Sequence, residues 1–462
     1  TSLIQGLCFL VFGLIVIQLF RLQVVNHKIY AAKANQQQIM KSTIFAKRGE
    51  IYFLDGDTPV PIVMNKKTYT ISIDPSLVVK KREETTKKID EIVGAYRVKT
   101  GWDEVFADPE RKYFVVAKNV PYTETNNLKK ADLVGVYEQE TTTRVYPEGE
   151  MAAQVLGFVN QDGEGQYGVE GSLNKELTGE NGLLKTVKDS NNVPLTIGNE
   201  NVKIPAKDGK NLVLTIDRNI QKKAEEAVDE VTKKFNITYG SAIVMNPATG
   251  QILAMAGKPG YNPAEYAKVT DAKVFQTDVT MNAFNPASVC KTFAIAAAID
   301  SGVMTPETTY YNTDRLVIDG WPIENAIKGH TGEISMQTVL TYSVNTGSIQ
   351  ALKLLGGSAS EITYQGKEKL YDYYHNRFNL GKYTGIELPE TKGTIVPPND
   401  IDATDARYAN MTFGQSLDLS IIQVASAFSA VVNGGEYYRP TLIAGEMKDG
   451  KFVRTELAEA DH

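Results

Sequence analysis

The most apolar stretch of the chain lies near its start. Residues Leu3–Phe20 include two Gln and two Gly but no charged side chain, and Arg21 follows them. An apolar run of this length is about sufficient for a helix to cross the hydrocarbon core of a membrane. A buried helix of a soluble domain is the alternative, and a cleaved signal peptide is disfavoured because no small-residue cleavage site follows. Basic residues can be counted on one flank only, so the positive-inside rule does not set the orientation.

The next part of the chain, from Lys41 to about Ala206, predicts an α+β module. Runs of β-branched and aromatic residues are separated there by Gly, Asp, Asn and Pro, at residues 68–79, 112–118 and 133–147. Such runs are typical of strands bounded by turns. The Lys-rich residues 80–96 predict a helix between two of these strands, and the polar residues 200–211 are the expected domain boundary.

The second half of the chain predicts a mixed domain that contains an antiparallel sheet. Residues 211–217 are expected to form a strand, and residues 218–235 have the spacing of a strongly amphipathic helix. Residues 240–257 predict two strands joined by an Asn-Pro-Ala-Thr-Gly turn, and an Ala-rich helix follows further along. This order favours a sheet with helices packed on it, so the whole chain is expected to be α+β and multidomain.

Composition narrows the possible chemistry. The net charge is −6 and no basic stripe stands out, which argues against nucleic acid as a partner because phosphates would not be neutralised. Cys8 and Cys290 lie far apart in sequence, and we do not expect a disulfide between them. The four histidines do not cluster with Cys, Asp or Glu at ligand spacing, so neither a metal nor a cofactor is predicted.

The first candidate for chemistry is a Ser-x-x-Lys tetrapeptide formed by Ser288 and Lys291 at the start of the Ala-rich helix. Residues three apart share a helix face, so the lysine amine can reach the serine hydroxyl. Apolar surroundings lower the pKa of a lysine and allow it to act as a base. The alternative is a core helix with a lysine whose amine extends to water. Ser172 and Lys175 match the same tetrapeptide, but in a polar, Gly-rich context.

The second candidate lies about 55 residues downstream, where Ser343 and Asn345 occur in a Tyr-Ser-Val-Asn-Thr-Gly segment. A hydroxyl and an amide two residues apart on a loop can point into one cleft, in the order of serine penicillin-recognising enzymes. A helix cap or a turn is the alternative. Ser190-Asn-Asn192 matches the same pattern, so the order and context of the two motifs decide.

The chain resembles the class B penicillin-binding proteins, the monofunctional peptidoglycan D,D-transpeptidases of bacterial division and elongation. The resemblance covers nearly the whole chain. It rests on AKRGEIY (with Arg48 and Gly49), RVYPEGEMAAQVLGFVN and GVEGSLNKELTGENG (with Arg144, Gly157, Glu170 and Gly171), LTIDRNIQKKAEEA, NPATGQILAM, YTGIELPETKG and MTFGQSLDLSIIQVASAFSAVVNGGEYYRP.

The resemblance implies a transmembrane anchor at residues 1–25, an elongated α+β pedestal of the dimerisation type at 26–205, and a penicillin-binding-type transpeptidase domain at 206–462. It implies that Ser288 attacks the D-Ala-D-Ala end of a stem peptide, with Lys291 as its base. Ser343 would relay a proton to the leaving amine, and Asn345 would bind the substrate amide and hold Lys291. β-Lactams would trap the same serine.

The resemblance also implies a single-pass membrane protein whose catalytic domain lies outside the cytoplasm, with a membrane-embedded peptidoglycan glycosyltransferase as a partner. Two features depart from the family pattern. Cys290 directly precedes Lys291, which is an oxidation or alkylation liability. The family's Lys-Thr-Gly or Lys-Ser-Gly motif does not follow Asn345, and Lys99–Gly101 lies in the pedestal instead. A truncated C-terminus is the expected explanation, with a degenerate enzyme as the alternative.

Two other functions stay open. The chain could be a non-catalytic homologue that acts as a scaffold or activator of a glycosyltransferase, or a hydrolase such as a carboxypeptidase or β-lactamase. The long pedestal and the expected anchor fit a hydrolase poorly. His330 is interpreted as a polar loop residue rather than a base, because Lys291 already supplies one.

Overall fold

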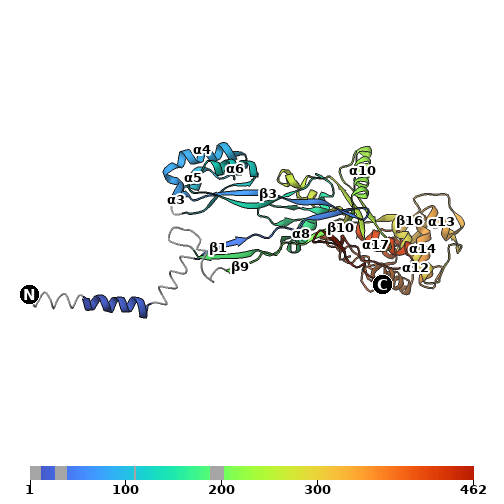
Figure 1. Cartoon of the computed structure of the whole chain (residues 1–462). Coiled ribbons are helices and arrows are strands. Elements are labelled where there is room, and N and C mark those ends of the chain that lie inside the picture. Colours follow the sequence, from blue (N-terminus) through green and yellow to red (C-terminus); the bar gives the residue numbers. More distant parts are fainter. Residues whose placement is uncertain (1–11, 27–38, 109–110, 188–201) are drawn as a thin grey trace, which may run out of the picture. The chain divides into compact units, whose positions relative to one another are not determined.

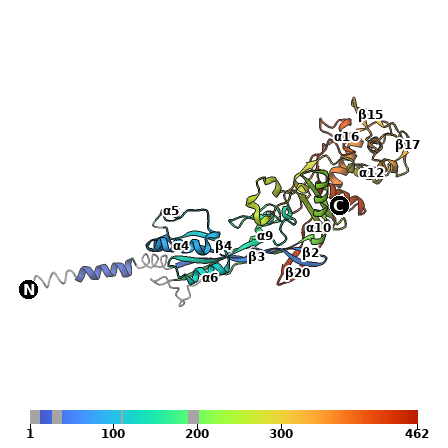
Figure 2. The same cartoon turned by 90° about the horizontal axis from the view of Figure 1, so that it is seen from above.

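The computed structural model describes residues 12–26, 39–108, 111–187 and 202–462. By its internal contacts the chain divides into two units. One comprises residues 1–49 and 178–209, and the other comprises residues 50–177 and 210–462. Figures 1 and 2 trace the elements of both units along the chain.

The first unit contains a three-stranded antiparallel sheet. Its central strand, β8 (Gly182–Val187), pairs with β1 (Ile39–Ile44) on one side and with β9 (Val202–Ile204) on the other. Residues 12–20 are helical and continue into a π-helical turn, η1 (Arg21–Val25). Within the described part of the chain, no helix combines the length and the apolar character needed to cross a membrane. Residues 3–11 of the expected span lie outside the described residues.

A seven-stranded sheet runs through the second unit in the order β20-β19-β10-β2-β3-β4, with β5 also paired to β3. All neighbours are antiparallel except β10 and β2. The strands are β2 (Ile51–Asp55), β3 (Thr58–Ile73), β4 (Phe114–Val120), β5 (Val136–Val145), β10 (Asn211–Asp217), β19 (Ile443–Lys448) and β20 (Lys451–Arg454). The sheet therefore joins early, middle and late segments of the chain in one layer.

Two helices cover the part of this sheet formed by β3 and β4. They are α4 (Arg82–Val93) and α6 (Tyr122–Lys130), which lie side by side in Figure 1. Ile89 and Val93 of α4 are fully buried and pack with Ile71 of β3 and Val116 of β4. The spacing of four residues places both apolar side chains of α4 on one face, so the helix predicted from residues 80–96 is confirmed.

The helix α10 (Arg218–Phe235) begins where β10 ends. The Asp217 carboxylate accepts hydrogen bonds from the backbone N–H groups of Asn219 (2.9 Å) and Ile220 (3.0 Å) and so caps the helix. The apolar face of α10 packs on the hairpin of β11 (Gly240–Met245) and β12 (Ile252–Lys258). The predicted strand, helix and hairpin are all confirmed here.

A group of helices forms the largest buried core of the second unit. It consists of α12 (Cys290–Asp300), α13 (Met336–Thr341), α14 (Asn345–Leu355), α15 (Tyr364–Tyr371), α16 (Asp405–Met411) and α17 (Ile421–Val432). Phe293 of α12, Leu352 of α14 and Tyr408 of α16 are fully buried in it. Figure 2 shows α12 and α16 close to the short strands β15 (Arg315–Ile318) and β17 (Gly332–Ser335).

Short elements connect these parts. Before β10 they are α3 (Pro75–Val78), η2 (Val79–Lys81), η3 (Gly94–Tyr96), α5 (Trp102–Val105), α7 (Ala153–Leu156), β6 (Phe158–Val159), β7 (Gly165–Gln166), α8 (Gly168–Ser172) and α9 (Asn174–Thr178). After β12 they are η4 (Pro263–Lys268), η5 (Ala272–Phe275), α11 (Asp278–Met281), β13 (Ala283–Phe284), η6 (Ala287–Val289), β14 (Thr309–Asn312), β16 (Trp321–Glu324), η7 (Asp372–Arg377) and β18 (Leu419–Ser420).

One prediction of secondary structure needs correction. Residues 75–79 were expected in a strand but are helical, because Asp74 caps α3 through the backbone N–H of Ser76 and Pro75 occupies its first position. The antiparallel pairing expected in the second half is present, both in the β10, β19 and β20 part of the large sheet and in the β11–β12 hairpin. The α+β class is as predicted.

Candidate active site

Ser288 lies in a tight turn directly before a buried helix. It is the middle residue of η6, and α12 begins two residues later. Its neighbour Ala287 has φ +53°, a left-handed conformation that is uncommon for a residue with a Cβ. The turn leaves Ser288 exposed, while most of the following helix is buried. The hydroxyl is thus presented to solvent near the N-terminal end of a helix, where the dipole favours negative charge.

A second segment of the chain, residues 414–420, holds this turn in place. The backbone N–H of Ala287 donates to the Gly414 carbonyl (3.1 Å). Asn285 Nδ2 donates to the Leu417 carbonyl and to Asp418 Oδ1, each at 2.7 Å. The pairing of β13 with β18 continues the same contact. Gly414 has φ +78°, and a Cβ there would stand only 2.0 Å from the Ala287 carbonyl oxygen, so the close approach requires glycine.

Lys291 is buried at the centre of the site. Its side chain is only 1% exposed. Lys291 Nζ donates to Ser288 Oγ at 3.1 Å, to Ser343 Oγ at 2.8 Å and to the Ser343 carbonyl at 2.6 Å. Burial lowers the pKa of Lys291 to about 8, because the charged ammonium loses its hydration. The lowered pKa expected from the sequence is therefore confirmed, and the amine can exchange protons near neutral pH.

Ser343 and Asn345 flank the start of α14, on either side of the buried Val344. Ser343 has φ +56°, which turns the chain so that its hydroxyl and its carbonyl both reach Lys291. Asn345 is the first residue of the helix, and its Nδ2 donates to the Glu324 carbonyl at 2.8 Å. The expectation that Asn345 holds Lys291 is wrong, because Ser343 occupies that position in the described chain.

Asn345 borders an open cleft of about 680 Å³. The cleft lies between β16, the start of α16 and the residues that follow α16. Its lining is mainly polar and includes Glu324, Arg407, Asn410, Gln415 and Ser416. A peptide with its own amide groups could therefore lie beside Asn345.

The other sequence matches are not organised in this way. Ser172 and Lys175 are both exposed, so the Lys175 amine remains solvated. Ser190–Asn192 lies outside the described residues. His330 lies in a loop, as predicted, and its ring packs at a tilt of 32° against Tyr342, with centroids 4.3 Å apart. Cys290 is fully buried and burial raises the pKa of its thiol to about 12, so the expected oxidation liability is wrong for the folded protein.

Two family models match the chain. The transpeptidase domain of penicillin-binding proteins matches residues 240–460, and the penicillin-binding protein dimerisation domain matches residues 43–214. The chain belongs to the class B penicillin-binding proteins. The transpeptidase model includes Ser288, Lys291, Ser343 and Asn345, and the dimerisation model includes Arg144 and Glu170.

Two curated relatives of this penicillin-binding protein align with most of its chain. It is 28% identical to stage V sporulation protein D of Bacillus subtilis over 397 residues, which are 85% of this chain and 58% of that protein. It is 27% identical to the probable peptidoglycan D,D-transpeptidase PbpC of Pseudomonas aeruginosa over 425 residues, 91% of this chain and 70% of that protein. The chain thus spans little more than half of the B. subtilis relative.

Solved structures share the fold. A peptidoglycan synthetase from Bifidobacterium adolescentis has a TM-score of 0.68 at 21% identity, covering 92% of this chain and 78% of that one. Penicillin-binding protein 3 from Mycobacterium tuberculosis, complexed with aztreonam, has a TM-score of 0.64 at 21% identity, covering 91% and 71%. At this identity the likeness shows the fold alone.

Two parts of this penicillin-binding protein's site were missed in the sequence. Gly414 lies about 125 residues from Ala287, whose backbone N–H it accepts, and Glu324 lies about 20 residues before Asn345, so no local spacing connects them. Gly414 occurs in the Met-Thr-Phe-Gly-Gln-Ser segment that carries part of the resemblance. An isolated glycine in that segment was the one available signal that two backbones approach closely.

Gly414→Ala tests how the Ser288 turn is held. We expect the rate of acylation by penicillin to fall by on the order of 10²-fold, because the added Cβ must displace Ala287 and with it Ser288. Gly302→Ala is the matched control, since Gly302 also has positive φ (+69°) but an added Cβ meets nothing within 4 Å. Stopped-flow acylation of both variants measures the difference, and equal rates would contradict the role of Gly414.

The pKa of Lys291 predicts a pH profile. Below pH 8 the neutral amine becomes scarcer, so the acylation rate should fall about tenfold per pH unit and level off above pH 8. The unfolded chain binds more protons than the folded one between the folded pKa of about 8 and the ordinary 10.5, so stability should rise with pH in that window. A rate profile that is flat from pH 6 to 9 would contradict Lys291 as the base.

Proposed function

We propose that this chain is a serine-type D,D-transpeptidase that cross-links peptidoglycan stem peptides through an acyl-enzyme on Ser288. The observation that carries the proposal is the shared amine of Lys291, which is buried, lies 3.1 Å from Ser288 Oγ and 2.8 Å from Ser343 Oγ, and has a pKa of about 8. A nucleophile, a base and a second hydroxyl within hydrogen-bonding distance are the parts that acyl transfer needs. The names of the relatives support the same reaction.

In the acylation step, neutral Lys291 takes the proton of Ser288 as Oγ attacks the carbonyl carbon of the D-Ala-D-Ala peptide bond. The bond to the terminal D-Ala nitrogen then breaks, and its electron pair leaves with the nitrogen. Lys291 returns the proton to this leaving amine through the Ser343 hydroxyl, which bridges the two positions. The terminal D-Ala departs, and the remaining stem peptide is held as an ester on Ser288.

In the second step, the amine of a neighbouring stem peptide attacks the ester carbonyl. Lys291 and Ser343 remove the proton of the incoming amine and return one to Ser288 Oγ, so that a peptide cross-link forms and the enzyme is regenerated. We assign Asn345 to the substrate amide, because its Nδ2 is fixed on the Glu324 carbonyl and its side chain borders the cleft. The Lys-Thr-Gly or Lys-Ser-Gly element does not occur between Asn345 and His462, and no residue is assigned its role.

Two further parts of the proposal concern location and domains. We propose that Leu3–Phe20 anchors the chain as a single membrane pass and that residues 206–462 form the catalytic domain outside the cytoplasm. The pedestal of residues 26–205 would set how far the catalytic domain stands from the membrane. A peptidoglycan glycosyltransferase would be a membrane partner. The apolar run and the dimerisation-domain match support this. Release of the protein from membranes by alkaline carbonate would contradict the anchor.

Labelling with a fluorescent penicillin tests the proposed function. The full-length gene product is expected to form a covalent adduct that survives denaturing electrophoresis. Ser288→Ala is expected to lose it completely, because Ser288 is exposed and its hydroxyl lies 3.1 Å from the amine of buried Lys291, whereas Ser343, which binds the same amine, is partly buried. Ser172→Ala removes the serine of the exposed Ser-x-x-Lys match and is the matched control, which should label like the parent.

Each alternative predicts a different result in the same experiment. A folded parent protein that never labels would favour the scaffold or activator. An adduct that forms and decays within seconds would favour a carboxypeptidase or β-lactamase, because water then reaches the ester readily. An adduct that persists for many minutes fits a transpeptidase.

A further inference from the structure

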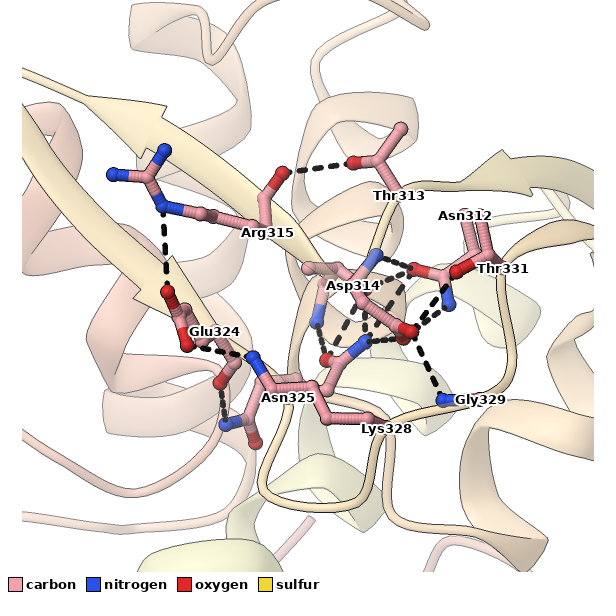
Figure 3. A network of polar contacts seen from close by, with 11 residues as sticks. Asn312, Thr313, Asp314, Arg315, Glu324, Asn325, Lys328, Gly329 and Thr331 are labelled. Carbon is pink, nitrogen blue, oxygen red and sulfur yellow. Dashed lines mark hydrogen bonds and ion pairs between the residues drawn. The ribbon is translucent and has the colours of Figure 1, made fainter.

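A buried carboxylate, Asp314, is connected through Asn325 to the segment that carries Ser343 and Asn345. It follows β14 and has φ +56°, a conformation that Asp and Asn tolerate better than other residues with a Cβ. It is 9% exposed. Among the described residues it forms no ion pair, so its negative charge is stabilised by neutral hydrogen-bond donors alone. Figure 3 shows these donors around it.

Four donors converge on the Asp314 carboxylate. Oδ1 accepts from Asn325 Nδ2 (2.8 Å) and Asn312 Nδ2 (3.1 Å). Oδ2 accepts from the Gly329 backbone N–H (3.1 Å) and Thr331 Oγ1 (2.9 Å). The hydrogen bonds, led by that from Asn325, lower the pKa of Asp314 to about 2, so it is ionised wherever the protein is folded. The Asp314 side chain therefore connects the end of β14 to the loop at residues 325–331.

The network continues from Asp314 to the C-terminal side of the Ser343–Asn345 loop. Asn325 Oδ1 accepts from the backbone N–H of Thr346 (3.0 Å), in the first turn of α14. Thr346 Oγ1 donates to Asn312 Oδ1 (2.6 Å). Asn312, Asn325 and Thr346 are each 3% exposed or less. Since Asn325 directly follows Glu324, the network also fixes the carbonyl that accepts the Asn345 amide.

The same network reaches the N-terminal side of that loop. Asn312 Nδ2 donates to the His330 carbonyl (2.8 Å), and the His330 ring packs against the Tyr342 ring at a tilt of 32°. Tyr342 directly precedes Ser343, whose positive φ needs support from its surroundings. The C-terminal end of the loop is thus connected to the Asp314 carboxylate through the buried side chains of Asn325 and Thr346. The N-terminal end is connected through Asn312 and then through the half-buried His330 and the exposed Tyr342.

We infer that Asp314 and Asn325 are positioning residues for acyl transfer, which hold Ser343 and Asn345 at the geometry that the substrate and Lys291 require. Neither touches Ser288 or Lys291, so they act only through the loop. The inference rests on the proposed function for its kinetic consequence. The geometric part, that Asp314 fixes residues 342–346, stands on the hydrogen bonds to Thr346 and on the ring contact between His330 and Tyr342.

Asp314→Asn is the variant that tests it. Asn has nearly the same shape and tolerates φ +56°, so the fold is kept, but its NH₂ group faces donors that need an acceptor. Asp217→Asn is the matched control. The Asp217 carboxylate also accepts several backbone N–H groups, those of Gly56, Asn219 and Ile220, but it caps α10 instead of supporting the loop.

Two measurements are made on both variants in the full-length protein. We expect the acylation rate by fluorescent penicillin to fall roughly tenfold in Asp314→Asn and to change less than about twofold in Asp217→Asn. We also expect backbone amides in peptides covering residues 342–350 to exchange with deuterium faster in Asp314→Asn, while those of α12 remain as protected as in the parent.

The two measurements distinguish the positioning role of Asp314 from the proposed transpeptidase function. Unchanged exchange at residues 342–350 in Asp314→Asn would overturn the positioning role, whatever the acylation rate. Faster exchange with an acylation rate equal to that of Asp217→Asn would also overturn it, because the loop would be loosened without consequence for the reaction. If the parent itself does not react with penicillin, the proposed function fails, and the exchange measurement alone decides whether Asp314 fixes the loop.

Discussion

Lys291→Met is expected to lower the rate of Ser288 acylation by about 10²–10⁴-fold, the range for removal of a positioned general base. The reason is geometric, because Lys291 Nζ lies 3.1 Å from Ser288 Oγ and 2.8 Å from Ser343 Oγ, and no second amine joins them in the described site. Met keeps most of the volume and is apolar, so we expect the variant to be as stable as the parent or more stable. Stopped-flow fluorescence and urea unfolding measure the two effects.

Lys175→Met is the control for this variant. Lys175 belongs to the other Ser-x-x-Lys match but is exposed, so its replacement should leave acylation unchanged. If Lys291→Met reacts with penicillin as fast as Lys175→Met, then Lys291 is not the base, and the buried amine would have only a structural role.

Glu170→Ala is expected to cause the largest loss of stability, about 3–5 kcal/mol, because it leaves a buried guanidinium without its carboxylate. Arg144 Nε donates to Glu170 Oε1 at 2.8 Å, and the two side chains are 5% and 0% exposed. Arg144 also donates to Asn65 Oδ1 (2.9 Å), so the pair joins β3, β5 and α8. Urea unfolding of the variant against the parent measures the loss.

The surface pair of Lys67 and Glu140 provides the comparison. Both side chains are more than half exposed, so Glu140→Ala should change the unfolding midpoint little. A loss in Glu170→Ala no larger than that in Glu140→Ala would show that the buried pair is not a structural anchor of the sheet.

The parts of the fold set by local pattern could be predicted from the sequence. The four-residue spacing of α4, the amphipathic face of α10 and the Asn-Pro-Ala-Thr-Gly turn between β11 and β12 each depend on neighbours within one element. The Ser288–Lys291 pair belongs to this class as well, because a separation of three residues fixes it on one helical turn.

The long-range pairings could not be predicted in this way. β10 pairs in parallel with β2, across about 160 residues of sequence, and β19 then pairs with β10. Strand periodicity states which face is buried but does not name the partner strand. The same limit applies to the Thr346 N–H, which donates to Asn325, and to Asn345, which donates to the Glu324 carbonyl, because each partner lies about 20 residues away in sequence.

The position of the acyl group tests most directly whether Ser288 is the nucleophile. The full-length protein is treated with benzylpenicillin, digested, and analysed by mass spectrometry to find the peptide that carries the added penicilloyl mass. We predict a single modified residue, Ser288, in the peptide that spans η6 and the start of α12. A penicilloyl group on any other residue, or no adduct in a protein that is folded by circular dichroism, would contradict the proposed nucleophile.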